Sequence, residues 1–132
     1  HCKRVVVTVA VNHVSFDRPI KLGDFVTIQT KVSRCFKSSM EVWADVWVED
    51  QITGARIACN SAIYTFVAVD QAGHPAHVPE VIPESDEEIR RYAGALRRRQ
   101  LRLILAGKMK PDEATELKAL FTGPDADDLL PR

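Results

Sequence analysis

The sequence predicts an α+β protein in which the strands come first and the helices last. Three observations lead to this prediction. Apolar and polar residues alternate along most of residues 3–69, as they do in strands that bury one face. The composition changes at Asp70, where a connector rich in proline begins. After a capping sequence at Ser85, apolar residues recur at helical spacing.

Four strands are expected before Asp70. Lys3–Val11 is rich in valine and threonine, and Ile57–Val69 is a long run of β-branched and aromatic residues. In Phe25–Val32 and in residues 41–49, small or β-branched residues on one face alternate with polar or aromatic residues on the other. The turn signals between the strands are Arg18-Pro19, Leu22-Gly23-Asp24, Lys37-Ser38-Ser39 and Thr53-Gly54. Because these gaps are short, we expect the strands to pair mostly antiparallel.

A surface connector and two helices are expected after Asp70. Gln71–Pro83 contains three prolines and a glycine, which suits an extended connector. Residues 85–88, Ser-Asp-Glu-Glu, form a capping box, and the helix that they begin should end at Ala106-Gly107. Pro111 should begin a second helix that stops at Gly123-Pro124, followed by a frayed tail over 125–132. The expected apolar positions of the two helices are Ile89, Tyr92, Leu96 and Leu103, then Leu117, Leu120 and Phe121.

Composition limits the classes of function. The 132 residues amount to one domain, and their 45% apolar content is enough for a small core. Lys+Arg and Asp+Glu both number 18, which argues against a protein whose main task is to grip nucleic acid or an acidic membrane. No apolar run reaches the ~20 residues of a membrane span, and no signal peptide is visible. Cys2, Cys35 and Cys59 indicate reduced thiols in a cytoplasmic protein, with a disulfide or metal cluster as the alternative.

Three blocks of sequence resemble the hotdog-fold acyl-CoA thioesterases (acyl-CoA hydrolases). Asn12–Asp24 is similar to the family pattern V-D-x-V-x-F-x-x-P-I-x-x-G-D, Phe36–Val42 to G-R-T-S-M-E-V, and Tyr64–Asp70 to F-T-F-V-A-L-D. The resemblance covers about residues 1–105. It implies a hotdog fold, in which a curved antiparallel sheet wraps a central helix. It also implies hydrolysis of acyl-CoA to the free acid and CoA.

The resemblance leaves the family's central helix outside this chain. That helix should lie just before His1, and residues 1–4 look like its exit. We therefore expect residues 1–83 to be the sheet portion and connector of a partial hotdog domain, and 84–132 to be a helical extension. The catalytic residue is expected upstream of His1, where a carboxylate or amide would activate water, and no residue of this chain is assigned to it. No G-x-S-x-G elbow is present, so an attacking serine is not expected.

The turn between the second and third strands is the main candidate for binding CoA. In the family it contacts the pantetheine and phosphate part of CoA at the seam between two subunits, which implies this role for Lys37, Ser38 and Ser39. Small polar residues allow close approach to a phosphate, and a cation neutralises it. Two departures weaken the match, because Lys37 replaces an arginine and Phe36 replaces a glycine. An ordinary polar turn is the alternative.

Other candidate residues carry weaker signals. Arg97 and Arg98 belong to a basic helix face that either contacts the phosphates of CoA or forms solvated ion pairs with acidic residues one turn away. Asn60 lies in mid-strand, where asparagine is disfavoured, and either lines the acyl site or bonds within the sheet. His74 and His77 lack a third ligand, so no metal is expected. No cofactor is expected, because CoA is part of the substrate.

The resemblance also implies self-association. Trp43 and Trp47 lie on one face of a strand and are unlikely to be left in water, so we expect a neighbouring subunit or the C-terminal helices to bury them. A homo-oligomer is expected, a dimer at minimum and a hexamer by preference. Nucleic acid and a membrane span are not expected. Two alternative functions stay open at this point. One is a hotdog module that binds acyl-CoA without turnover, and the other is a dehydratase acting on acyl thioesters, which the P-I-x-x-G-D block fits less well.

Overall fold

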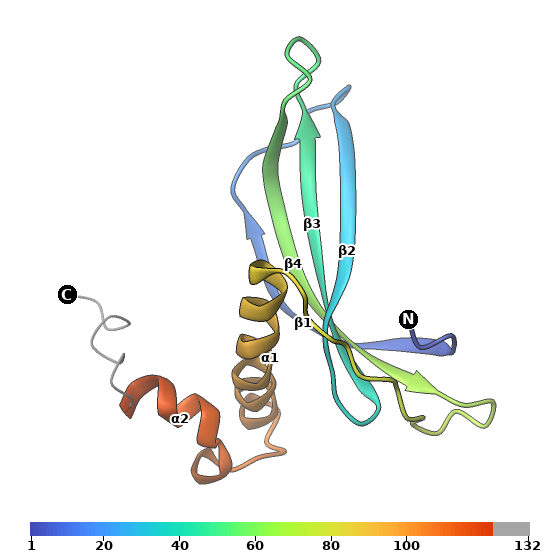
Figure 1. Ribbon diagram of the computed structural model, residues 1–132, viewed down its shortest axis with the longest axis vertical. Helices are drawn as coiled ribbons and strands as arrows, with labels where there is room; N and C mark the ends of the chain where they lie inside the picture. The colour runs from blue at the N-terminus through green and yellow to red at the C-terminus, as the bar shows by residue number, and fades with distance from the viewer. Residues whose placement is uncertain (123–132) are drawn as a thin grey trace. The chain divides into compact units, whose positions relative to one another are not determined.

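The computed structural model describes residues 1–122 and confirms the α+β order (Figure 1). Four strands precede two α-helices and a short 3-10 helix. Their bounds are β1 Val5–Phe16, β2 Phe25–Cys35, β3 Ser39–Glu49, β4 Arg56–Val69, α1 Asp86–Leu105, the 3-10 helix Pro111–Glu113 and α2 Thr115–Thr122. The stop expected at Gly123-Pro124 and the tail over 125–132 lie outside the described residues, as do the side chains of Leu120 and Phe121. No helix precedes β1 within residues 1–122.

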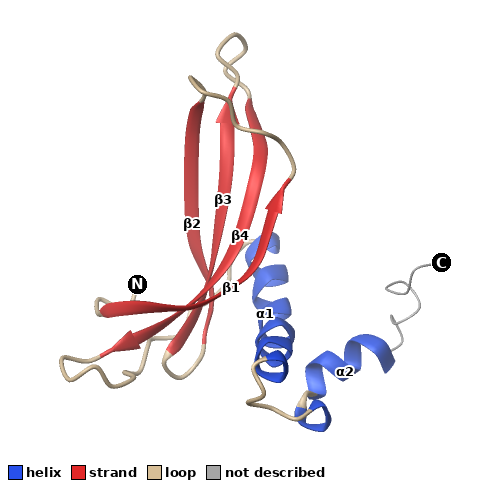
Figure 2. Ribbon diagram, turned by 180° about the vertical axis from the view of Figure 1, so that it is seen from behind, coloured by secondary structure: helices blue, strands red, loops and turns tan. Residues whose placement is uncertain are grey.

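All four strands pair antiparallel in one sheet, as expected, in the order β1-β4-β3-β2. The sheet is strongly twisted (Figure 2). β1 and β2 follow one another in the chain but form opposite edges, so the segment 17–24 crosses from one edge to the other. The first strand was expected to end at Val11, and this bound was wrong. β1 continues to Phe16 because it resumes pairing with β4 after a bulge at Asn12.

Cross-strand pairing gives the sheet two distinct faces. Val32, Val42, Tyr64 and Val11 are partners across the four strands and define what we call the valine face. Lys31, Trp43, Ile63 and His13 are partners in the next row and define the tryptophan face. These rows confirm the alternation predicted for β2 and β3. Large apolar side chains of the edge strands are exposed on the valine face, namely Val11, Val14, Phe16, Val26 and Ile28.

A small core lies where the connector returns to the sheet. Met40, Ala68 and Val78 are buried together, and Cys2, Val32, Cys35 and Phe66 pack against them. Val78 lies in the connector, and its backbone amide donates to the Lys37 carbonyl oxygen at 3.1 Å. The connector therefore fixes the turn between β2 and β3 onto the sheet.

The chain divides into two compact units, His1–Pro83 and Glu84–Arg132. In the second unit the capping box is formed as predicted. The Ser85 hydroxyl accepts from the Glu88 amide at 3.2 Å, and the Glu88 carboxylate accepts from the Ser85 amide at 3.1 Å. Helix α1 ends at the predicted place, with Ala106 as its C-cap. Residues 111–113 form a 3-10 turn, so the second α-helix starts later than predicted, at Thr115. Within its first turn, the Leu117 amide donates to the side-chain oxygen of Gln100 on α1 at 3.0 Å.

Ser85→Ala should destabilise the helical unit by about 1 kcal/mol, because the Glu88 amide loses its acceptor at the start of α1. Ser85→Asp keeps an acceptor and should stay close to the native stability. Urea denaturation followed by circular dichroism at 222 nm measures both. Equal loss in the two variants would show that the cap is not what stabilises this helix end.

Candidate functional site

The β2–β3 turn is held from three directions. The Phe36 amide donates to the Ser39 carbonyl oxygen at 2.8 Å and closes the turn. The Ser38 carbonyl accepts from the Ala68 amide at 2.9 Å, and the Lys37 carbonyl accepts from Val78. With its carbonyls bound on β4 and the connector, the turn presents an exposed Lys37 side chain beside half-buried Ser38 and Ser39. The structure therefore brings together the three residues predicted to contact CoA.

The two departures from the family pattern have different consequences. Lys3 is the one non-glycine residue with a positive φ among the residues described, so Phe36 occupies the glycine position without strained backbone. The Phe36 ring also receives the Arg34 guanidinium, whose carbon lies 5.5 Å from the ring centroid. Arg34 therefore adds a second cation close to Lys37 at this end of the sheet. Lys37 keeps the positive charge but not the bidentate geometry of an arginine.

A buried polar group beneath the turn was not predicted from the sequence. Glu41 of β3 is 4% exposed, and its Oε1 accepts from the Ser33 hydroxyl at 2.6 Å and from the Trp43 indole at 3.1 Å. Ser33 is the bulged residue of β2, since the pairing shifts between Val32 and Arg34. Serine directly after an alternating valine run was the available signal, but its partner depends on a register that the sequence does not state.

Asn60 lies on the valine face of β4, opposite Val46 and Phe16. Its Oδ1 is buried and has no hydrogen-bond partner among the residues described, so the alternative of a side-chain bond within the sheet is not seen for that atom. The turn residue Ser39 pairs with Val67, seven positions further along β4. That spacing places Asn60 about 23 Å from the turn. The structure therefore separates the residue predicted to line the acyl site from those predicted to hold CoA.

The predicted arginines belong to helix α1 in the other unit. Arg98 donates from Nη2 to the Arg91 carbonyl at 2.7 Å, and its guanidinium lies over Gly94, where an added Cβ would approach Nη1 to 2.5 Å. Arg91 forms an ion pair with Glu87 at 2.6 Å, one of the pairs expected under the alternative reading of this face. Burial, and then the neighbouring charge of Arg99, lower the pKa of Arg102. Arg97 is half-buried on the same helix.

The cysteines and histidines were the candidates for a disulfide or a metal site. Cys2, Cys35 and Cys59 are free thiols. Burial raises the pKa of Cys35 to about 11, and the nearby Cys2 adds to the rise. Residues 1–122 contain no cluster of three or more His, Cys, Asp or Glu side chains suited to a metal ion. His74 lies near Asp70, with 4.0 Å from Nδ1 to the carboxylate. In the same part of the chain, no helix has the length and apolarity to cross a membrane.

Comparison with known families matches residues 1–55 to the model of the Thioesterase superfamily. An uncharacterised acyl-CoA thioester hydrolase of Bacillus subtilis is 40% identical over 98 residues, which are 74% of this chain and 57% of that protein. The cytosolic acyl coenzyme A thioester hydrolase of Rattus norvegicus is 31% identical over 94 residues, 70% of this chain and 25% of the relative. The chain thus spans at most about three fifths of the length of these relatives.

Solved structures of acyl-CoA thioesterases share the fold. A hexameric acyl-CoA thioesterase in its apo form superposes with a TM-score of 0.76 at 33% identity, covering 83% of this chain and 70% of the other. The acyl-CoA hydrolase of Staphylococcus aureus, solved with butyryl coenzyme A, coenzyme A and coenzyme A disulfide, gives 0.75 at 36% identity, covering 82% and 68%. These likenesses confirm the predicted resemblance and extend over the four-stranded sheet described above.

Cys35, next to the turn, should react slowly with iodoacetamide at pH 8. A thiol with a pKa of about 11 is then ionised in only about one molecule in a thousand, and only the thiolate attacks. Its labelling rate should rise about tenfold per pH unit and level off above pH 11, because the raised pKa keeps the thiol neutral below that value. Peptide mass spectrometry, with free glutathione as the reference thiol, measures this profile. Labelling of Cys35 at the rate of glutathione at pH 8 would contradict it.

Proposed function

Since this chain belongs to the hotdog-fold thioesterase superfamily, we propose that the protein hydrolyses acyl-CoA thioesters to the free acid and CoA. The observation that carries the proposal is the likeness of its sheet to an acyl-CoA hydrolase that binds butyryl coenzyme A and coenzyme A. Water would add to the thioester carbonyl, and the carbon–sulfur bond would then break with CoA as the leaving group. A thioester carbonyl is already electrophilic, so a positioned carboxylate or amide suffices to activate that water.

The described residues would bind the substrate and leave the chemistry to another group. Lys37, Ser38 and Ser39 would hold the phosphate and pantetheine part of CoA. A contact of Arg97 and Arg98 with the phosphates of CoA stays a prediction from the sequence. Asn60 would line the acyl site. The catalytic carboxylate or amide is assigned to none of the described residues. Residues 1–83 would then be the sheet portion of the hotdog domain, and 84–132 its helical extension. A cytoplasmic location follows by analogy with the rat relative, which is named cytosolic.

One rival is favoured by the same observations. The groups gathered at the turn are suited to binding and include no activated nucleophile, so a hotdog module that binds acyl-CoA without turnover would use the same residues. The discriminating experiment is an assay of the full-length protein with butyryl-CoA. Release of free thiol, followed with a thiol-reactive dye, supports hydrolysis. Tight binding without thiol release supports the module, and formation of an enoyl product from a 3-hydroxyacyl thioester would support a dehydratase.

The same assay tests the mechanism. Mass spectrometry of the protein during turnover should show no covalently acylated residue, because water attacks directly. An acylated serine or cysteine on this chain would overturn that mechanism while leaving the hydrolase activity intact.

Lys37→Ala should weaken CoA binding by about 1–2 kcal/mol, the scale of one charge-assisted contact. The loss should shrink as salt is raised, because the Lys37 side chain is exposed and its interactions are screened. Isothermal titration calorimetry at low and high salt measures both effects. Lys21→Ala, an equal charge change at the opposite end of β2, should leave the dissociation constant unchanged. An unchanged constant for Lys37→Ala at low salt would remove the turn from the site.

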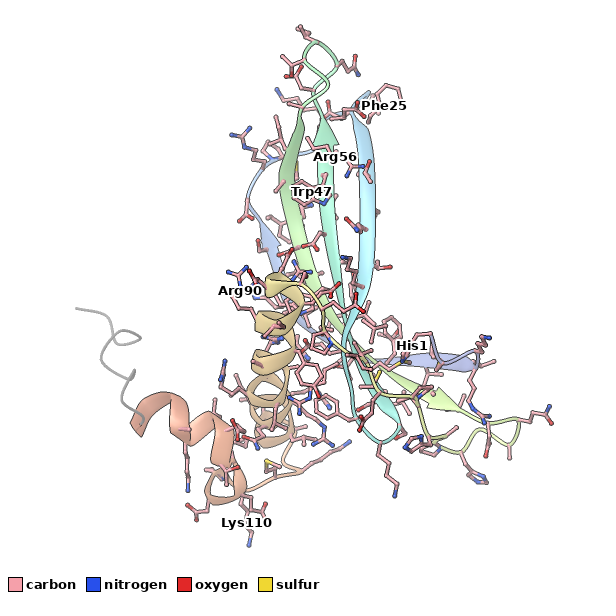
Figure 3. All side chains as sticks on the ribbon, viewed as in Figure 1. His1, Phe25, Trp47, Arg56, Arg90 and Lys110 are labelled. Atoms are coloured by element: carbon pink, nitrogen blue, oxygen red, sulfur yellow. The ribbon has the colours of Figure 1, made fainter. Side chains whose placement is uncertain are left out.

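We also propose that the protein is a homo-oligomer, a dimer at minimum and a hexamer by analogy with its hexameric neighbour. Trp47 lies two residues before the end of β3, close to Phe25 and Arg56, which mark the end of the sheet near the β3–β4 hairpin (Figure 3). The Trp47 indole nitrogen is buried and has no hydrogen-bond partner among the described residues. The Trp47 ring is only partly buried in this chain, so a neighbouring subunit would cover the rest of it on the tryptophan face.

Trp47→Glu should break the larger assembly and leave the dimer. The dimer seam is proposed to run along a strand edge, whereas Trp47 lies on β3 in the interior of the sheet. Trp47→Phe keeps an apolar ring and should retain the native mass. Light scattering coupled to size exclusion at micromolar concentration separates these states. A monomeric mass for the native protein would contradict the assembly and the two-subunit CoA site that depends on it.

A further inference from the structure

A row of polar side chains crosses the sheet on the tryptophan face, directly behind the β2–β3 turn. It consists of Ser33 on β2, Glu41 on β3, Thr65 on β4 and Asn12 on β1. Ser33 donates to Glu41 at 2.6 Å, Glu41 and Thr65 are cross-strand partners, and Asn12 donates from Nδ2 to the Thr65 hydroxyl at 3.1 Å. Ser33, Glu41 and Thr65 are only 4–7% exposed. Each strand thus contributes one polar side chain to a single line, which is buried from Ser33 to Thr65 and exposed at Asn12.

Both ends of this row are bulged residues. The β2–β3 pairing shifts between Val32 and Arg34 and leaves Ser33 extra. The β1–β4 pairing shifts between Val11 and His13 and leaves Asn12 extra. A bulge bends its strand and increases the local twist, so it changes the direction of the residues that follow it in the strand. In β2, the Phe36–Ser39 turn begins three residues after the bulge.

Glu41 is costly for packing alone. A buried carboxylate needs hydrogen bonds to offset the loss of its hydration, whereas an apolar side chain would fill the same space without them. Its Oε1 accepts from Ser33 and Trp43, and the Ser33 hydroxyl also lies 3.2 Å from the Glu41 carbonyl oxygen. Ser33 is therefore bound to both the backbone and the side chain of Glu41. These contacts fix the extra residue of β2 against β3 two residues from the end of the turn.

We propose that Glu41 is a positioning residue for coenzyme A binding. By holding the Ser33 bulge, it would set the twist of the β2–β3 hairpin and thereby the direction in which Lys37, Ser38 and Ser39 present their groups. This inference rests on the proposed function only for the identity of the ligand. The effect on the turn itself does not depend on that function, which allows the two ideas to fail separately.

The first measurement follows the turn without ligand. Hydrogen exchange of the Phe36 amide, which closes the turn on Ser39, is read by NMR or by peptide mass spectrometry of the full-length protein. Glu41→Ala should speed this exchange at least about tenfold, because two donors lose their acceptor and the bulge is released. Glu41→Gln keeps a carbonyl oxygen for them and should restore slow exchange. Glu49→Ala removes the same charge at the far end of the same strand and should change nothing at Phe36.

The second measurement follows binding of coenzyme A by calorimetry. Glu41→Ala should raise the dissociation constant about tenfold, with Glu41→Gln within about twofold of the native value. The double variant Glu41→Ala/Lys37→Ala should raise the dissociation constant by less than the product of the two single fold-increases, because both substitutions act through the same turn. In turnover, Glu41→Ala should raise KM more than it lowers kcat, because it touches no reacting atom.

Faster exchange at Phe36 together with weaker binding, both rescued by glutamine, supports the proposal. A lower melting temperature with native exchange at Phe36 and a native dissociation constant would overturn it and leave Glu41 a purely structural residue. If Glu41→Ala does not fold, Ser33→Ala removes the 2.6 Å donor alone and carries the same test, and native values for it would overturn the proposal too. Absence of coenzyme A binding by the native protein would contradict the proposed function. The exchange rate of the Phe36 amide would then still test whether Glu41 positions the turn.

Discussion

The pairing of β4 with both β1 and β3 is the constraint on which the rest of the structure depends. Side chains alternate with a period of two, so a slip of one residue would exchange the two faces of the sheet. The observed register puts Asn60 on the valine face and Glu41 on the tryptophan face. The amide of Ala68, just before the end of β4, also binds the Ser38 carbonyl and so fixes the turn. The pairing of β4 therefore sets the positions of both Asn60 and the β2–β3 turn.

The valine face sets a requirement on the complete assembly. Its edge-strand side chains are exposed in this chain, and Phe16 retains 78% of its accessible surface. A contiguous apolar face of this kind is stable in water only when another element or another copy covers it. The Asn60 Oδ1, which is buried and has no hydrogen-bond partner among the described residues, lies on the same face. Acyl chains are apolar, so a largely apolar face of this kind is chemically suited to receive them.

Local patterns predicted the fold better than the site. The alternation in β2 and β3 and the capping box at Ser85 each involve residues close in sequence, and each prediction was confirmed. The end of β1 was missed because the bulge at Asn12 interrupts the period of two. The 3-10 turn at Pro111 was missed because the same residues can begin either kind of helix. These errors arise where backbone geometry departs from the regular element.

The site required information that only the register supplies. Ser33 and Glu41 are eight positions apart, and nothing in their spacing shows that a bulge joins them. The sequence likewise did not show that Asn60 is far from the turn along β4. What the sequence did indicate was the composition of the turn, because a cation with two small hydroxyl residues is a local feature.

The turn combines two kinds of polar residue with different physical roles. Lys37 is exposed, so the contribution to binding that we propose for it is electrostatic and would fall with salt. Glu41 is buried and acts through short hydrogen bonds that salt hardly screens. The charge at the turn and the geometry of the turn can therefore vary independently, because the first depends on Lys37 and the second on buried hydrogen bonds. A relative could alter the cation at the turn, as this chain does with lysine, while the buried frame beneath it still sets where that cation points.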